Sequence, residues 1–394
     1  MSQQPDSIGV RRQIGIYTEG MRGSRPELPV AFEDLEARAH TVMKPEAVGY
    51  VYGSAGGGST ALANRAAFEQ WRIVPRVLRD VSQRDLHVDL LGHTLDYPLL
   101  LAPVGVLGIV HPDGEIAVAR ASLAAGVPMI LSTVSSHTIE DVAAANGDGT
   151  RWFQLYWGRN RDIAASMIRR AENAGYSALV VTLDTKFIAW REHDIQNAYL
   201  PFLHGDGLAN FLSDPAFRAA LPKPPEEDPL TAIRYFASIF TDPSLMWSDL
   251  AWLRSNTRLP IVLKGIQHAD DARIAFDHGV NAIIVSNHGG RQVDGAVASL
   301  DCLEAAVAAA GDMPVLFDSG IRRGNDILKA LALGARAVLL GRPYVYGLAL
   351  AGEAGITHVV QNLLADFDLT VALSGMSGVA DLNPDCLVYT PREN

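Results

Sequence analysis

Short apolar runs recur along the chain, and alanine-rich amphipathic segments lie between most of them. The runs contain mainly Val, Ile and Leu without polar alternation, which is typical of strands covered on both faces of a sheet. Strand and helix in repeated alternation predict an α/β fold, a parallel (β/α)8 TIM barrel. The eight predicted strands are 99–104, 128–132, 152–156, 178–184, 261–264, 282–286, 314–318 and 337–341.

Two parts of the chain depart from this alternation. Residues 1–95 are predicted to form an N-terminal extension that packs on the barrel, with helices near 32–40 and 59–68. Within the barrel domain of residues 96–394, residues 204–248 form an insert after the fourth strand, with a Pro-rich loop at 222–229. Because this insert leaves the C-terminal end of a strand, we expect either a lid over the active face or a disordered excursion.

Composition narrows the possible partners and locations. The 394 residues are 48% hydrophobic and carry a formal net charge of -11, which argues against a nucleic-acid partner. Cys302 and Cys386 are the only cysteines, so neither a disulfide framework nor a metal-binding spacing is present. Residues 1–23 have no apolar signal core, and the longest apolar run, 98–110, is too short to span a membrane. We therefore expect a cytoplasmic protein with no metal and no membrane partner.

The stretch 286–294, Ser-Asn-His-Gly-Gly-Arg-Gln-Val-Asp, follows the sixth predicted strand. His288 can take a proton near neutral pH, and Arg291 can hold a carboxylate through two hydrogen bonds. Gly289 and Gly290 allow backbone to approach a ligand closely. A single histidine or arginine in a loop is usually structural or solvated. Both together at the C-terminal end of a barrel strand predict proton abstraction from a small carboxylic acid.

Polar or glycine residues occupy the other strand ends as well, where barrel enzymes place their chemistry. Glycines and arginines after the seventh and eighth strands predict a phosphate site, and the amide and hydroxyl groups suit a planar heterocycle. In chain order the candidates are Pro103, Val104, Gly105, Ser132, Gln154, Tyr156, Thr182, Asp184, Arg191, Lys264, Ser286, Asp318, Gly320, Arg322, Gly341 and Arg342.

Two of these residues leave alternatives open. Lys264 either stabilises negative charge on a cofactor or serves as the Schiff-base lysine of an aldolase. Asp184 either orients His288 or caps a helix. A binding module without turnover is a third possibility, which the complete set of His288, Arg291, Arg191 and Tyr156 disfavours.

The sequence Ser-Asn-His-Gly-Gly-Arg-Gln at 286–292 resembles the active-site signature of FMN-dependent α-hydroxy-acid oxidising enzymes. The resemblance runs from about residue 30 to the end and is supported at 153–156, 263–265, 318–322 and 341–343. Residues 201–203, 213–217 and 252–254 are most similar to the lactate 2-monooxygenase branch, and this likeness extends into the insert.

The resemblance implies a role for each matching position. His288 would be the base, supported by Asp184, while Arg291 and Arg191 would hold the substrate carboxylate. Tyr156 and Tyr50 would bind the substrate by hydrogen bonds. The implied FMN site comprises the backbone of Pro103, Val104 and Gly105, the isoalloxazine contacts Ser132, Gln154, Thr182, Lys264 and Ser286, and the ribityl phosphate contacts Asp318, Gly320, Arg322, Gly341 and Arg342.

The chain also departs from its relatives near the expected entrance. Gly57 and Gly58 replace an acidic pair, Tyr52 replaces a small residue, and 186–189 differs, so these changes concern substrate identity. Gly105 matches the monooxygenase, whereas many oxidases have alanine, although some dehydrogenases also have glycine.

The resulting prediction is FMN-dependent oxidation of a small L-2-hydroxy acid with dioxygen as the oxidant. Lactate 2-monooxygenation to acetate, carbon dioxide and water is the leading hypothesis. A 2-hydroxy-acid oxidase or dehydrogenase for lactate, glycolate or a mandelate-like acid is the alternative. The resemblance also implies a homo-oligomer, either a tetramer or an octamer.

Overall fold

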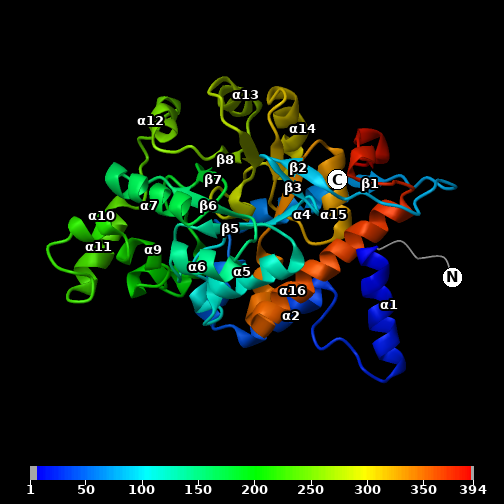
Figure 1. Ribbon diagram of the computed structural model, residues 1–394, viewed down its shortest axis with the longest axis horizontal. Coiled ribbons are helices and arrows are strands. Elements are labelled where there is room, and N and C mark those ends of the chain that lie inside the picture. Colours follow the sequence, from blue (N-terminus) through cyan, green and yellow to red (C-terminus); the bar gives the residue numbers. More distant parts are fainter. Residues whose placement is uncertain (1–6, 392–394) are drawn as a thin grey trace.

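The computed structural model describes residues 7–391 and contains a closed barrel of eight parallel strands (Figure 1). The strands neighbour one another in the order β10-β11-β4-β5-β6-β7-β8-β9. Each predicted apolar run overlaps one barrel strand, so the predicted TIM barrel is confirmed. The strands are β4 (Leu99–Leu101), β5 (Met129–Ser132), β6 (Arg151–Tyr156), β7 (Leu179–Thr182), β8 (Ile261–Ile266), β9 (Ala282–Val285), β10 (Val315–Phe317) and β11 (Ala337–Leu340).

Helices cover the outside of the barrel and bury the outward side chains of its strands. The longest, α16, continues from β11 and packs against both α5 and the N-terminal helices; its helical backbone is interrupted at 351–352. The covering helices are α5 (Gly114–Ala125), α6 (Ile139–Asn146), α7 (Arg161–Asn173), α12 (Leu250–Ser255), α13 (Ala269–Asp277), α14 (Ser299–Ala309), α15 (Gly324–Ala332) and α16 (Arg342–Leu373).

A hairpin of β2 (Val88–Leu90) and β3 (His93–Leu95) closes the N-terminal end of the barrel. Its residues Val88, Leu90 and Leu95 belong to the same apolar cluster as the inward side chains of the barrel strands. Arg336, just before β11, donates a hydrogen bond to the Asp89 carbonyl, which fixes the hairpin at this end. The opposite, C-terminal end of the barrel is therefore the open one.

The N-terminal extension is helical, as predicted, and contains four helices. They are α1 (Ile8–Met21), α2 (Phe32–Val42), α3 (Pro45–Tyr52) and α4 (Ser59–Glu69). The sequence predicted helices near α2 and α4 but not α1 or α3. The extension ends in β1 (Trp71–Ile73), which pairs antiparallel with β12 (Leu387–Tyr389) and so ties the two ends of the chain together.

The insert after β7 forms short helices rather than a structureless excursion. They follow α8 (Glu192–Gln196) and are the 3-10 turn η2 (Pro201–His204), α9 (Ala209–Leu212), α10 (Pro215–Ala219), α11 (Pro229–Ile239) and η3 (Trp247–Asp249). Aromatic rings from these segments pack on one another, with Phe211 and Phe236 4.8 Å apart and Phe236 and Phe240 4.9 Å apart between centroids. This small apolar core gives the insert a fixed shape above the barrel. Among the described residues, no helix is long and apolar enough to cross a membrane.

Candidate active site

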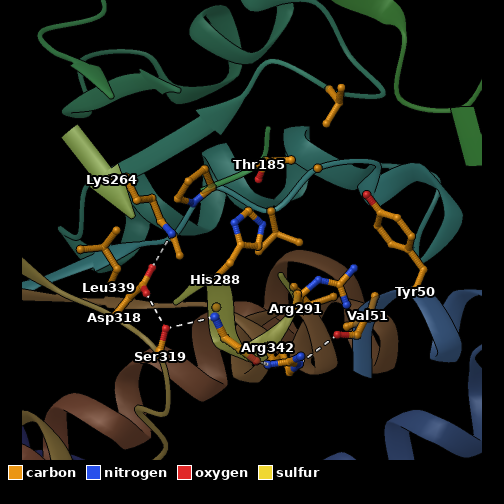
Figure 2. Close-up of a pocket in the computed structure, with 18 of the residues that line it drawn as sticks. Tyr50, Val51, Thr185, Lys264, His288, Arg291, Asp318, Ser319, Leu339 and Arg342 are labelled. Carbon is orange, nitrogen blue, oxygen red and sulfur yellow. Dashed lines mark hydrogen bonds and ion pairs between the residues drawn. The ribbon is translucent and has the colours of Figure 1, made fainter. Parts of the chain in front are cut away.

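A cavity at the C-terminal ends of the strands brings most of the candidate residues together. Figure 2 shows His288 between Lys264 on one side and Arg291 on the other, with Asp318 and Arg342 beneath them. The candidates that line this cavity are Tyr50, Pro103, Val104, Gly105, Tyr156, Arg191, Lys264, His288, Arg291, Asp318, Gly320, Arg322, Gly341 and Arg342. The other candidates, Ser132, Gln154, Thr182, Asp184 and Ser286, do not line it but lie behind or beside the lining residues.

His288 lies in a 3-10 turn, η4 (His288–Gly290), directly after β9, with a left-handed backbone at φ 59°. Its Nδ1 lies 2.8 Å from Asp184 Oδ1 at the end of β7. Burial lowers the pKa of His288, and the charge of Asp184 with its hydrogen bond offsets only part of that effect. With Nδ1–H donated to Asp184, Nε2 is the basic nitrogen, and it is neutral near pH 7.

Asp184 is the ionised partner of this pair. Burial alone would raise the pKa of Asp184, but the charges of His288 and Lys264 and the hydrogen bond from His288 outweigh burial and lower the pKa. The structure therefore places Asp184 against the histidine rather than at a helix N-cap. A carboxylate in this position orients the imidazole and stabilises its protonated form.

Two serine hydroxyls hold the loops after β9 and β10 in register. Ser286 Oγ accepts a hydrogen bond from the His288 backbone N–H at 3.0 Å and from Lys264 Nζ at 2.8 Å. Ser319 Oγ accepts from the backbone N–H of Gly289 at 3.0 Å and donates to Asp318 at 2.8 Å (Figure 2). The left-handed turn at His288 is thus fixed by both neighbouring strand ends.

Lys264 is buried and paired with Asp318, whose Oδ2 lies 2.9 Å from Nζ. Burial opposes the charge, but the carboxylates of Asp318 and Asp184 outweigh it and raise the pKa of Lys264. A Schiff-base lysine must be neutral to attack a carbonyl and relies on a lowered pKa. The arrangement therefore argues against the aldolase and favours a fixed positive charge at the floor of the cavity.

Two arginines form the cationic wall opposite Lys264. Arg191 donates to the Arg291 carbonyl at 3.2 Å and to Gln292 Oε1 at 2.8 Å, while Arg291 donates to the Gly53 carbonyl at 2.6 Å. Burial and the neighbouring charges of Arg191 and Arg342 lower the pKa of Arg291 to about 9. An anion entering the cavity would relieve this unfavourable burial of positive charge, which suits a carboxylate.

Two phenols face the same space. Tyr50, from α3, lies beneath the Arg291 guanidinium, which is 5.2 Å from the ring centroid. Tyr156 stands at the end of β6. Burial raises the pKa of both phenols, so both remain protonated and act as hydrogen-bond donors at neutral pH.

A second cationic region lies after β10 and β11. Arg342 opens α16 and donates to the carbonyls of Val51 and Gly289, both at 3.0 Å, which joins α3 to the histidine turn. Burial lowers the pKa of Arg342, and burial together with the charge of Arg342 lowers the pKa of Arg322 to about 10. Two half-buried cations beside the N-terminus of a helix form a site for a phosphate group.

The residues behind the cavity supply unused hydrogen-bonding capacity. Gln154 Oε1 accepts from Ser132 Oγ at 3.1 Å, whereas its Nε2 is buried without a partner. A buried amide donor is costly unless a ligand satisfies it. Thr182 differs, because it lines a neighbouring cavity rather than the one that contains His288.

The loop around Gly105 is positioned by a residue that the sequence did not single out. Glu115, buried in α5, accepts from the backbone N–H of Leu107 at 3.0 Å and of Ser136 at 3.1 Å. The Cβ of an alanine at position 105 would lie 2.6 Å from Val134 O. The loops after β4 and β5 therefore touch here, and only glycine fits without displacing backbone.

The insert contributes two further lining residues, Phe202 and Phe240. The sequence predicted a lid at 204–248, but it did not identify which side chains reach the cavity. Phe202 lies outside those limits, within η2. Apolar side chains within an insert carry no periodic signal that separates ligand contacts from internal packing.

Comparisons with known proteins agree with this geometry. A family model described as FMN-dependent dehydrogenase matches residues 39–389. An FMN-dependent alpha-hydroxy acid dehydrogenase of Penicillium citrinum is 47% identical over 380 residues, which are 95% of this chain and 94% of that protein. An L-lactate oxidase of Lysinibacillus sphaericus is 45% identical over 361 residues, 91% of this chain and 93% of that protein.

Solved structures give the same result at the level of the fold. A crystal structure of a mutant of an active chimera of (S)-mandelate dehydrogenase has a TM-score of 0.83 and 40% identity, covering 91% of this chain and 99% of that chain. A mandelate oxidase structure has a TM-score of 0.81 and 38% identity, covering 91% and 98%.

Proposed function

The chain belongs to the family of FMN-dependent 2-hydroxy-acid oxidases and dehydrogenases, and from that premise we propose that it is a lactate 2-monooxygenase. FMN is its cofactor, and oxidation of a 2-hydroxy acid is its reaction. The proposal adds the substrate, lactate, and the products, acetate, carbon dioxide and water. One observation carries it: Phe202 and Phe240 of the insert line the same cavity as His288 and Arg291.

The residues present fit FMN by the chemistry of their donors. Arg322 and Arg342 would hold the phosphate, while the unpartnered Nε2 of Gln154 would donate to the heterocycle. Lys264 would place its positive charge beside the ring system. When bound there, FMN accepts the two electrons that leave the substrate.

Substrate binding follows from the cationic wall. Arg291 and Arg191 would bind the lactate carboxylate, and the protonated phenols of Tyr50 and Tyr156 would donate to its oxygens. Nε2 of His288 would take up the proton released as the C–H and O–H bonds of lactate become a carbonyl. Asp184 stabilises the resulting imidazolium, because its carboxylate is 2.8 Å from Nδ1.

The fate of the products decides between oxidase and monooxygenase. Oxidation of lactate by dioxygen gives pyruvate and hydrogen peroxide. If both stay together, peroxide attacks the pyruvate carbonyl and the adduct loses carbon dioxide to leave acetate and water. Enclosure by Phe202 and Phe240 makes this second reaction effectively unimolecular.

Simple L-lactate oxidation is the second candidate, and the 45% identity to an L-lactate oxidase favours it. In that case pyruvate and peroxide leave separately, and the insert only covers the barrel mouth.

The test is product analysis after lactate turnover in air, with and without excess catalase. The proposal expects acetate and carbon dioxide in amounts equal to the lactate consumed, unchanged by catalase, because peroxide never leaves the cavity. Stoichiometric pyruvate in the presence of catalase would establish the oxidase. Catalase is essential here, because peroxide released into solution also decarboxylates free pyruvate.

A further inference from the structure

A second cavity lies beside the active site, between the insert and the ends of β7 and β8. Its volume is about 610 Å³, within the range of roughly 300–1,000 Å³ that holds small organic ligands. Tyr156, Thr185 and Phe240 line both this cavity and the active-site cavity, so these three side chains form the partition between the two.

Phe240 is the part of the partition that comes from the insert. Its ring packs against Tyr156 with centroids 5.1 Å apart, and against Phe202 at 5.6 Å. The side chain is 7% exposed, and it follows directly after α11. Tyr156 is held by β6 and is a proposed substrate contact, whereas Phe240 makes no polar contact with the proposed catalytic groups.

The backbone around Phe240 is anchored to the barrel. The N–H of Arg159 donates to the Ile239 carbonyl at 2.9 Å. A Cβ at Gly158 would lie 2.4 Å from that same carbonyl, so the insert and the end of β6 are in close contact. The ring of Phe240 is thus a fixed wall rather than a loose flap.

The second cavity, on the far side of Phe240, suits an apolar substituent of the substrate. Its lining includes Trp157, Leu183, Leu245, Trp247 and Ile266, and polar groups such as Asp242 and Ser248 share the cavity. An alkyl or aryl substituent that crossed the partition would gain about fourfold in affinity for each buried methylene.

We propose that Phe240 sets the side-chain length of the 2-hydroxy acids that this enzyme accepts, by closing the active site off from the second cavity. The intact wall restricts the substrate to short side chains such as the methyl group of lactate. Removing the ring joins the two cavities and admits longer aliphatic side chains. This inference rests on the proposed 2-hydroxy-acid site, but not on whether acetate or pyruvate is the final product.

The test is anaerobic flavin reduction by unbranched (S)-2-hydroxy acids from lactate to 2-hydroxyoctanoate. For the wild-type holoenzyme, the rate constant for flavin reduction divided by the Kd of the hydroxy acid should fall steadily as the side chain of the acid lengthens. Phe240→Ala should raise this ratio for 2-hydroxyoctanoate at least ~10-fold, as expected if two or more methylenes become buried. Phe240→Leu, which keeps most of the packing with Phe236, should give a smaller gain in the same direction.

Two control variants test whether the gain for 2-hydroxyoctanoate comes from the second cavity. Leu245 lines only the second cavity, so Leu245→Trp alone should leave lactate reduction unchanged, and in the Phe240→Ala background it should abolish the gain for 2-hydroxyoctanoate. Phe202→Ala enlarges the active-site cavity without opening the partition and should not favour the eight-carbon acid. Binding of 2-oxooctanoate, followed by the flavin absorbance, provides a readout that does not depend on turnover.

Equal wild-type reduction by lactate and 2-hydroxyoctanoate would overturn the inference, as would a gain that survives the Leu245→Trp filler. Failure of the proposed function looks different. Pyruvate and peroxide from lactate in air would refute monooxygenation, yet the anaerobic chain-length series would still report on Phe240.

Discussion

At the scale of single residues, the proposed catalytic arrangement depends on a histidine in an unusual backbone conformation. A left-handed φ of 59° is uncommon for a residue other than glycine. Hydrogen bonds from the backbone N–H groups of His288 and Gly289 to the serines after β9 and β10 offset its cost. The side chain is thereby turned toward Asp184, so the backbone of the motif is as much a part of the site as its imidazole.

The His288–Asp184 pair predicts a defined dependence of flavin reduction on pH. Burial lowers the pKa of His288, and the base must be neutral to accept a proton, so the reduction rate should rise with pH through that lowered pKa and then level off. Asp184 favours the charged imidazolium. Asp184→Asn should therefore move the rising limb to lower pH and reduce the plateau by at least ~10-fold. Stopped-flow reduction by lactate from pH 4 to 9 measures both. A rising limb that moves to higher pH would contradict the pairing.

The cationic wall of Arg291 and Arg191 predicts that carboxylate binding depends on the geometry of the guanidinium as well as on its charge. Arg291→Lys keeps a cation but loses the planar fork that grips a carboxylate, so Kd for lactate should rise and flavin reduction should slow. Comparison of lactate with its methyl ester supplies the measurement. The wild-type enzyme should strongly prefer the acid, and the variant should discriminate less. Equal reactivity of the ester with the wild-type enzyme would show that Arg291 does not bind the carboxylate.

At the scale of elements, the proposed retention of products requires the insert to stay close to the barrel. The two are in contact at Gly158. Because a methyl group there would collide with the Ile239 carbonyl, Gly158→Ala should displace the end of α11. Overpacking of this kind costs about 1–3 kcal/mol of stability. Free peroxide should rise several-fold and acetate should fall, while anaerobic flavin reduction changes less.

A matched variant, Gly15→Ala, separates displacement of the insert from any general effect of replacing a glycine by alanine. A methyl group added at Gly15, in α1, would have no neighbouring atom within 4 Å, so Gly15→Ala should leave the products unchanged. If Gly158→Ala gives as much acetate as the wild-type enzyme despite a lower melting temperature, the insert does not retain the products.

The strands were predictable because burial on both faces demands continuous apolar runs, and those runs also marked where polar strand ends would converge. The helix α1 was not predicted, because only Gly9 within it is buried and apolar residues such as Ile14 and Tyr17 are exposed, so no core-facing stripe marks it. Similarly, β1 and β12 are short segments that pair across more than 300 residues, and neither carries a pattern of its own. Glu115 and Phe240 were missed because their roles depend on which loops they meet in space.

At the scale of the whole molecule, the fold concentrates positive charge that it does not neutralise itself. The chain carries a net charge of -11, yet Arg291, Arg322 and Arg342 are gathered at one end of the barrel with their pKa values lowered by burial. Burying like charges together costs stability in the absence of an anionic ligand. The apoprotein should therefore gain stability from a cofactor that brings negative charge to this end.

This predicts that FMN stabilises the fold more than riboflavin, which has the same ring but no phosphate. A ligand at 100 times its Kd adds about 2.7 kcal/mol to the free energy of unfolding, and a tighter ligand adds more at the same concentration. At equal concentrations, FMN should raise the melting temperature of the apoprotein further than riboflavin does. Arg322→Gln should narrow the difference by weakening only the phosphate contact, because the variant keeps Gln154 and Lys264 for the ring. Differential scanning fluorimetry of apoprotein with each flavin makes the comparison. Equal shifts for the two flavins would mean that the cations at Arg322 and Arg342 do not meet the phosphate, and that their charge serves the substrate side of the cavity instead.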